Sequence, residues 1–175
     1  MALLLLMPVS AKTASVNEKR AAEPEVKAAF IYNFSKFVNW PSASFQNDTS
    51  PIHICIVDDL EISEAFEAFG NKMSKGRQIQ VIPSGKNSGF DKCHLLFIGR
   101  QSDHAATKKI LASVAKRAVL TIGDSPAFVA QGGMIGFLTS ENRVIFEINP
   151  KTAMRCGLEI SSKLLGVARI AGDLP

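Results

Sequence analysis

Residues 131–165, which read QGGMIGFLTSENRVIFEINPKTAMRCGLEISSKLL, are the most apolar and most patterned stretch of this 175-residue chain. Two short runs within it, 134–138 and 143–148, predict a β-hairpin. Gly132 and Gly133 stand just before the first of these strands. They lack the further glycines and the Lys-Ser/Thr pair of a phosphate-binding loop, so they predict a turn from a helix end into a strand. The stretch contains no obvious catalytic group, and we expect it to pack or to dock.

The end of this stretch predicts two short helices. Asn149 and Pro150 favour a helix start, since asparagine caps helix N-termini and proline suits the first helical position. Gly157 is placed to end that helix, and Ser161 or Ser162 to cap the next one after an extended link. Some apolar side chains of such a tail stay accessible as a partner-binding patch, or all of them pack in the core; both interpretations are open. The residues assigned to the patch are Pro150, Ala153, Leu158, Ile160, Leu164 and Leu165.

Upstream of the hairpin, predicted strands alternate with predicted helices. The strands are expected at residues 52–57, 78–82, 93–98 and 118–122. The helices are expected at residues 24–40, over 58–70, from 102–103 onward, and over 126–130. This alternation predicts an α/β fold, a single-domain layered mixed sheet flanked by helices, with a C-terminal β-hairpin and two short helices.

The first of these helices is expected to begin at Pro24, because proline is favoured at the first helical position. Trp40 and Pro41 should close it, since the residue before a proline is pushed out of the helical region. Apolar residues recur at helical spacing along this segment, as on a core-facing helix. The expected core face carries Val26, Phe30, Phe34, Phe37 and Val38.

The composition is that of an ordinary globular domain, with 46% hydrophobic and 21% charged residues. A chain of this length can bury a substantial core, and we expect one domain over residues 23–171. The net charge of +4 is spread along the chain without a long basic cluster. This distribution indicates a solvated surface and argues against nucleic-acid binding.

The N-terminus carries a possible export signal. Residues 2–9 are an apolar run far too short to span a bilayer. Small residues before and at Ala11 predict cleavage after that residue, which makes residues 1–11 a signal peptide and residues 12–22 a flexible linker. No Lys or Arg precedes the run. Either the start of the signal is truncated, or the run is a buried helix; we favour secretion.

The cysteines fit an exported protein. Cys55 and Cys93 fall in two predicted strands, and in an oxidising compartment a disulfide between them is the natural interpretation. Closing a loop of about 38 residues would stabilise the fold by on the order of 4 kcal/mol. The alternative is a pair of reduced core cysteines. Cys156 is then left as a free thiol or as a link between two chains.

His53 and Cys55 share one strand face and Cys93 and His94 are adjacent, as pairs of metal ligands can be. Adjacent strand residues point to opposite faces, so these four supply at most three ligands. We therefore expect no metal and no other cofactor.

Enzymatic chemistry is also not expected. Ser125 lies beside Asp124 after a predicted strand, but it is not in a glycine-flanked elbow. The sequence does not place a base, a nucleophile and an orienting group together. An alternative to a pure docking protein is a small-ligand-binding sensor that acts on a membrane receptor or kinase. Its cleft would lie at the strand ends, near Asp58, Asp124 and Gly132.

Three segments together resemble the YfiR family of small periplasmic proteins. They are PEVKAAFIYNFSKFVNWP at 24–41, RAVLTIGDSPAFVAQGGMIGF at 117–137 and NRVIFEINPKTAMRCGLEISSKLLGVA at 142–168. The resemblance implies a mixed α/β fold, homodimers and redox sensitivity through disulfides. It also implies that Cys55 and Cys93 form the family's long-range disulfide. The second, short-range disulfide has no counterpart, because the hairpin carries Gly136 and no cysteine near it.

The same resemblance implies a function. The family's characterised member represses an inner-membrane diguanylate cyclase by binding its periplasmic sensor domain, and an OmpA-like outer-membrane lipoprotein sequesters it. Its partner-binding surface involves the C-terminal segment. We therefore expect a periplasmic, non-enzymatic negative regulator that lowers cyclic-di-GMP and restrains biofilm formation.

Overall fold

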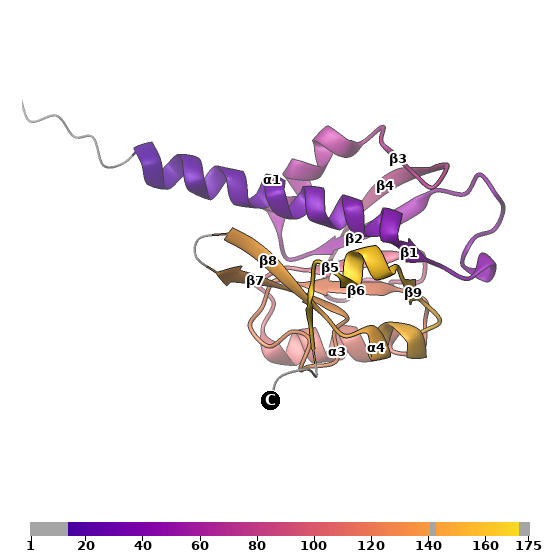
Figure 1. Ribbon diagram of the computed structural model, residues 1–175. Helices are drawn as coiled ribbons and strands as arrows, with labels where there is room; N and C mark the ends of the chain where they lie inside the picture. The colour runs from indigo at the N-terminus through magenta and orange to yellow at the C-terminus, as the bar shows by residue number, and fades with distance from the viewer. Residues whose placement is uncertain (1–13, 141–142, 172–175) are drawn as a thin grey trace, which may run out of the picture.

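The computed structural model describes residues 14–140 and 143–171, with side chains from residue 23 onward (Figure 1). The helices are α1 (Ala14–Phe37), α2 (Leu60–Ala65), α3 (His104–Val114), α4 (Pro150–Arg155) and α5 (Ser162–Leu165), with 3-10 turns at Ser42–Ser44 and Phe66–Phe69. The strands are β1 (Val38–Asn39), β2 (Ile52–Val57), β3 (Met73–Ser74), β4 (Arg77–Ser84), β5 (Leu95–Ile98), β6 (Leu120–Gly123), β7 (Ile135–Ser140), β8 (Arg143–Ile148), β9 (Glu159–Ile160) and β10 (Arg169–Ile170).

An eight-stranded sheet in the order β10-β8-β7-β6-β5-β2-β4-β3 forms the centre of the molecule. Its five middle strands, β7 to β4, run parallel. β8 pairs antiparallel with β7 and completes the predicted hairpin. The sheet is therefore mixed, and the predicted α/β fold class is confirmed. β4 lies on one side of β2 and β5 on the other, so the direction in which the chain adds strands reverses at β2.

Helices cover both faces of this sheet, with α1 on one side and α3 on the other (Figure 1). β5 shows why, because its alternate side chains enter two different cores. Phe97 packs in the cluster that contains Phe34 of α1. Leu96 packs in the cluster that contains Ile110 of α3. All four residues of β5 are buried, as the continuous apolar run predicts.

α1 differs from its prediction at both its start and its buried face. It begins at Ala14, so Pro24 lies inside the helix, and residues 14–22 are helical where a flexible linker was expected. These residues are rich in alanine and in charged residues with high helix propensity. Val26 is 41% exposed, whereas Lys27 beside it is 4% exposed, so the expected core face was wrong at this turn. The expected signal peptide, residues 1–11, lies outside the described residues.

The segment between β6 and β7 forms turns instead of the helix expected over 126–130. Ala127 has a φ of 58°, which interrupts a right-handed helix. The glycine pair behaves as predicted for a turn. Gly132 has a φ of +103°, and a Cβ at Gly133 would lie 2.1 Å from the Phe128 ring. Gly132 therefore needs glycine for its positive φ, and Gly133 needs it because a side chain would collide with Phe128.

The C-terminal tail confirms its predicted capping. Asn149 Oδ1 accepts a hydrogen bond from the Thr152 N–H at 3.0 Å at the start of α4. Gly157 has a φ of 77°. The N–H of Leu158 donates to the Ala153 carbonyl at 3.0 Å, which folds the chain back after α4. β9 then pairs antiparallel with β1, and Ser161 caps α5. These contacts fasten the tail to the end of α1.

Candidate functional site

Half of the residues assigned to the partner-binding patch belong to the core. Ala153 and Leu158 are each 1% exposed and Leu164 is 5% exposed. Side chains that are buried in this way cannot contact a partner directly, so the assignment is corrected for these three. The reason is the fold-back after α4, which turns Leu158 inward.

The accessible part of the tail is the C-terminal surface, which we define as Pro150, Met154, Ile160, Leu165 and Val167. Pro150, Ile160 and Leu165 are half-buried. Met154 is 71% exposed and Val167 is 74% exposed, and sequence reasoning missed both. A signal for Met154 existed, because a residue next to a core position on a helix points away from the core.

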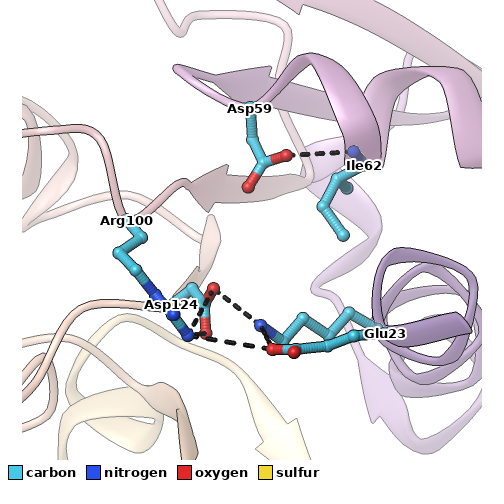
Figure 2. A network of polar contacts seen from close by, with 6 residues as sticks. Glu23, Asp59, Ile62, Arg100 and Asp124 are labelled. Carbon is cyan, nitrogen blue, oxygen red and sulfur yellow. Dashed lines mark hydrogen bonds and ion pairs between the residues drawn. The ribbon is translucent and has the colours of Figure 1, made fainter. Parts of the chain in front are cut away.

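A second candidate site is a cleft of about 290 Å³ at the carboxyl ends of the parallel strands, which we call the polar cleft. Asp59 follows β2, Arg100 follows β5 and Asp124 follows β6. α1, which packs on one face of the sheet (Figure 1), supplies Glu23 and Lys27. Pro24, Glu61, Ile62 and Gln101 complete the lining. Figure 2 shows Glu23, Arg100 and Asp124 meeting from three separate elements, with Asp59 apart from them near Ile62.

Lys27 is the centre of this cleft. Its Nζ lies 2.5 Å from Glu23 Oε1 and 2.7 Å from Asp124 Oδ2. Lys27 is 4% exposed and Asp124 is 8% exposed, so their ion pair is almost fully desolvated. Arg100 Nη2 adds a longer contact of 3.4 Å to Asp124. The hydrogen bond from Lys27 lowers the pKa of Glu23.

Asp59 stands on the opposite wall of the cleft. Its Oδ1 accepts a hydrogen bond from the Ile62 N–H at 3.0 Å and so caps α2. Burial raises the pKa of this carboxyl, and the negative charges of Asp124 and Glu61 raise it further. The second oxygen of Asp59 is turned toward the side of the cleft where Asp124 and Glu23 lie (Figure 2).

The sequence predicted a cleft near Asp58, Asp124 and Gly132. Of these three residues, only Asp124 lines the polar cleft. Asp58 has a φ of 56° and instead bonds Ser102 and, at 3.2 Å, Lys86. Gly132 lines a different cavity beside Cys156. Glu23 and Lys27 were missed, because nothing in the local sequence links α1 to a strand end about one hundred residues away.

Uncharged contacts join β2 to the segment that leads into β5. Cys55 and Cys93 form the predicted disulfide, with 5.7 Å between their Cα atoms. The bond also removes both thiolates from any metal site. His94 is 7% exposed, and its Nδ1 accepts a hydrogen bond from the His53 backbone N–H at 3.1 Å. Its Nε2 therefore carries the proton and donates to the Ser44 carbonyl at 3.0 Å. Burial lowers the pKa of His94.

Cys156 is not part of a disulfide and is half-buried. Its Sγ donates a weak hydrogen bond to the Ala115 carbonyl at 3.3 Å. Burial raises the pKa of this thiol, which keeps it protonated and slow to react near neutral pH.

A family model described as YfiR/HmsC-like matches residues 24–169. The chain belongs to the YfiR/HmsC-like family. This family consists of regulatory, non-catalytic proteins of the periplasm that act in cyclic-di-GMP signalling. No curated protein matches the chain. Among the described residues, no helix has the length and apolar character that a membrane span requires.

Proposed function

We propose that the protein is a periplasmic negative regulator that binds the periplasmic sensor part of an inner-membrane diguanylate cyclase and so lowers cyclic-di-GMP. The observation that carries this proposal is the YfiR/HmsC-like match, which extends from the start of the core-forming part of α1 to the end of the tail. Export across the inner membrane is part of the proposal, and the signal-like residues 1–11 support it.

The C-terminal surface is the proposed contact. Met154 and Val167 expose large apolar side chains that a partner could cover. The segment that carries them is held by the fold-back at Gly157 and by the pairing of Val38 with Ile160. A surface that is fixed before binding loses little conformational freedom when the partner docks.

Two further partners follow from the family resemblance alone. The protein would form homodimers, and an OmpA-like outer-membrane lipoprotein would sequester it and release the cyclase. Cys156 is half-buried and its thiol is held protonated, so a covalent link between two chains is not part of this proposal.

Genetic removal tests the function. Deletion of the gene should raise cyclic-di-GMP and biofilm mass, and the wild-type gene should restore both. An unchanged cyclic-di-GMP level in a strain that contains the cyclase would contradict the repressor role.

A matched set of variants tests the contact. The double variant Met154→Asp/Val167→Asp should fold normally, since both side chains are mostly exposed, and should fail to restore repression. The control is Leu60→Asp, which changes an equally exposed apolar residue on α2, 71% exposed, outside the C-terminal surface. If the double variant represses as well as the control, the contact lies elsewhere.

A second candidate function is a sensor of small ligands that acts on a membrane receptor or kinase. The polar cleft favours it, because open α/β sheets bind ligands beyond the carboxyl ends of their strands.

A further inference from the structure

The polar cleft lies where the connectivity of the sheet reverses. β4 and β5 flank β2 on opposite sides, and the loops that follow β2 and β5 therefore separate at their carboxyl ends. In open α/β sheets this is the crevice in which ligands bind, whatever their chemistry. Asp59 follows β2 and Arg100 follows β5, so the two walls of the cleft come from the two sides of that crevice.

The charges in this crevice do not balance. Its lining contains the carboxylates of Glu23, Asp59, Glu61 and Asp124 and the cations of Lys27 and Arg100, which leaves two negative charges in excess. Both cations already contact Glu23 and Asp124. Within the described part of the chain, neither Asp59 nor Glu61 forms an ion pair. The excess is thus concentrated on the α2 side of the cleft.

Asp59 is poorly solvated for a charged group. It is half-buried, one of its oxygens is engaged by α2, and the other is turned into the cleft (Figure 2). The raised pKa of Asp59 has the same physical origin, namely burial together with the neighbouring charges of Asp124 and Glu61. A cation placed beside the second oxygen would relieve both effects.

The occupant should be an organic cation and not a metal ion. No group of three or more His, Cys, Asp or Glu side chains in the described residues is arranged to hold a metal ion. Calcium needs six or more oxygen ligands, which this wall does not gather. The cleft of about 290 Å³ has room for a small molecule. That volume equals about ten water molecules at about 30 Å³ each.

We propose that the polar cleft binds a small organic cation, a primary amine or guanidine, whose charged end pairs with Asp59 and Glu61. This inference rests on the second candidate function and names the ligand class for it. Lys27 and Asp124 form the rigid floor of the site. Arg100 stands at its solvent side, where its side chain is 61% exposed.

Three probes of equal length test the charge requirement on the full chain. Putrescine, 1,4-butanediol and succinate share a four-carbon skeleton and end in cationic, neutral and anionic groups respectively. Each probe is titrated into the protein while backbone amide NMR signals are recorded. Only putrescine should cause saturable chemical-shift changes near Asp59, Glu61 and Arg100. Equal binding of butanediol would mean that charge does not select the ligand, and preference for succinate would mean an anion site. Either outcome, or no saturable shift with any probe, overturns the proposal.

Variants then locate the contact. Asp59→Asn keeps an N-cap residue on α2 while it removes the charge, and Glu61→Gln changes an exposed side chain. Each should weaken putrescine binding by about threefold to fivefold, as expected for one partly exposed ion pair. The control is Asp103→Asn, the same substitution at the cap of α3 outside the cleft, which should leave the affinity unchanged. Unchanged affinity in both cleft variants would contradict the assignment.

These measurements use purified protein and do not depend on repression. If gene deletion leaves cyclic-di-GMP unchanged while putrescine binds as described, the repressor proposal fails and the cleft assignment stands. The reverse combination would remove the cleft assignment and leave the repressor proposal intact.

Discussion

Different kinds of contact are found toward the two ends of the parallel strands. On the amino side of β5, the segment that leads into this strand is joined to β2 by a disulfide and by a neutral imidazole whose two nitrogens are both hydrogen-bonded. At the carboxyl ends, a buried lysine and aspartate meet in a cleft with unpaired carboxylates beside them. Buried charges are costly to desolvate, whereas covalent and neutral contacts are not. The comparison indicates that covalent and neutral contacts fix β2 beside β5, whereas the carboxyl ends form a cleft lined mainly by charged side chains.

Reduction of the disulfide should have the largest effect on stability. The bond closes a loop of 38 residues, and its loss should lower the free energy of unfolding by about 4 kcal/mol. Urea unfolding with and without reductant measures this, in a Cys156→Ser background so that no other thiol contributes. A change of less than about 1 kcal/mol would contradict the role given to the disulfide in fixing β2 beside β5.

Lys27→Met should have the next largest effect. It leaves the buried carboxylate of Asp124 without its closest cation, which should cost about 3 kcal/mol. The matched control is Arg100→Met, which removes a 61% exposed partner of the same carboxylate and should cost less than about 1 kcal/mol. Equal losses in the two variants would show that burial does not distinguish these two cations.

Acidification should weaken the amino end through His94. Its pKa in the folded protein is lowered by burial, so the unfolded chain takes up the proton first. The stability due to neutral His94 is present above the unfolded pKa of about 6.5 and is lost as the pH falls below that value toward the folded pKa, by at most about 1.4 kcal/mol per pH unit. Glu23 has a lowered pKa, so its contribution is lost only below about pH 4.5.

Urea midpoints between pH 5 and 7 would detect this effect. His94→Asn should flatten the profile, whereas His104→Asn, at the exposed start of α3, should not. A profile that is unchanged by His94→Asn would assign the pH dependence to another group.

Asp59→Asn should have the smallest effect on stability. It tests whether the charge of Asp59 contributes to holding the carboxyl ends of the strands. Asparagine caps helices about as well as aspartate, so the cap of α2 is retained. Because the pKa of Asp59 is raised in the fold, its ionised form opposes folding at neutral pH. The variant should therefore be as stable as the wild type or slightly more so in thermal unfolding at pH 7. A clear loss would mean that the charge of Asp59 has a structural partner.

Local patterns predicted most of the fold. The cap at Asn149, the stop at Gly157 and the cap at Ser161 were predicted from the sequence, because each depends on residues within one turn. The longer strands, β2 and β4 to β8, were predicted from their apolar runs, whereas the two-residue strands β1, β3 and β10 were not predicted. The disulfide was one of two interpretations of the cysteines that the sequence left open.

The candidate sites were less predictable, because they depend on contacts between distant segments. Lys27 sits among apolar residues of α1 and gives no local sign that it pairs with Asp124, 97 residues away. In the tail, spacing alone did not separate buried Leu164 from half-buried Leu165. That distinction depends on where α1 and β1 lie against the tail, which only the folded structure specifies.

The attachment of the tail to α1 has a mechanical consequence. From Lys27 in the polar cleft to Phe37, where Ser161 donates to the Phe37 carbonyl at 2.8 Å, α1 runs as one unbroken helix. That distance is about 15 Å at about 1.5 Å per residue. Because an α-helix is stiff along its axis, a shift of Lys27 along that axis would also move Phe37. Ile160 would follow, because its neighbour Ser161 is bonded to Phe37. α1 thus links the polar cleft directly to the segment that carries Ile160.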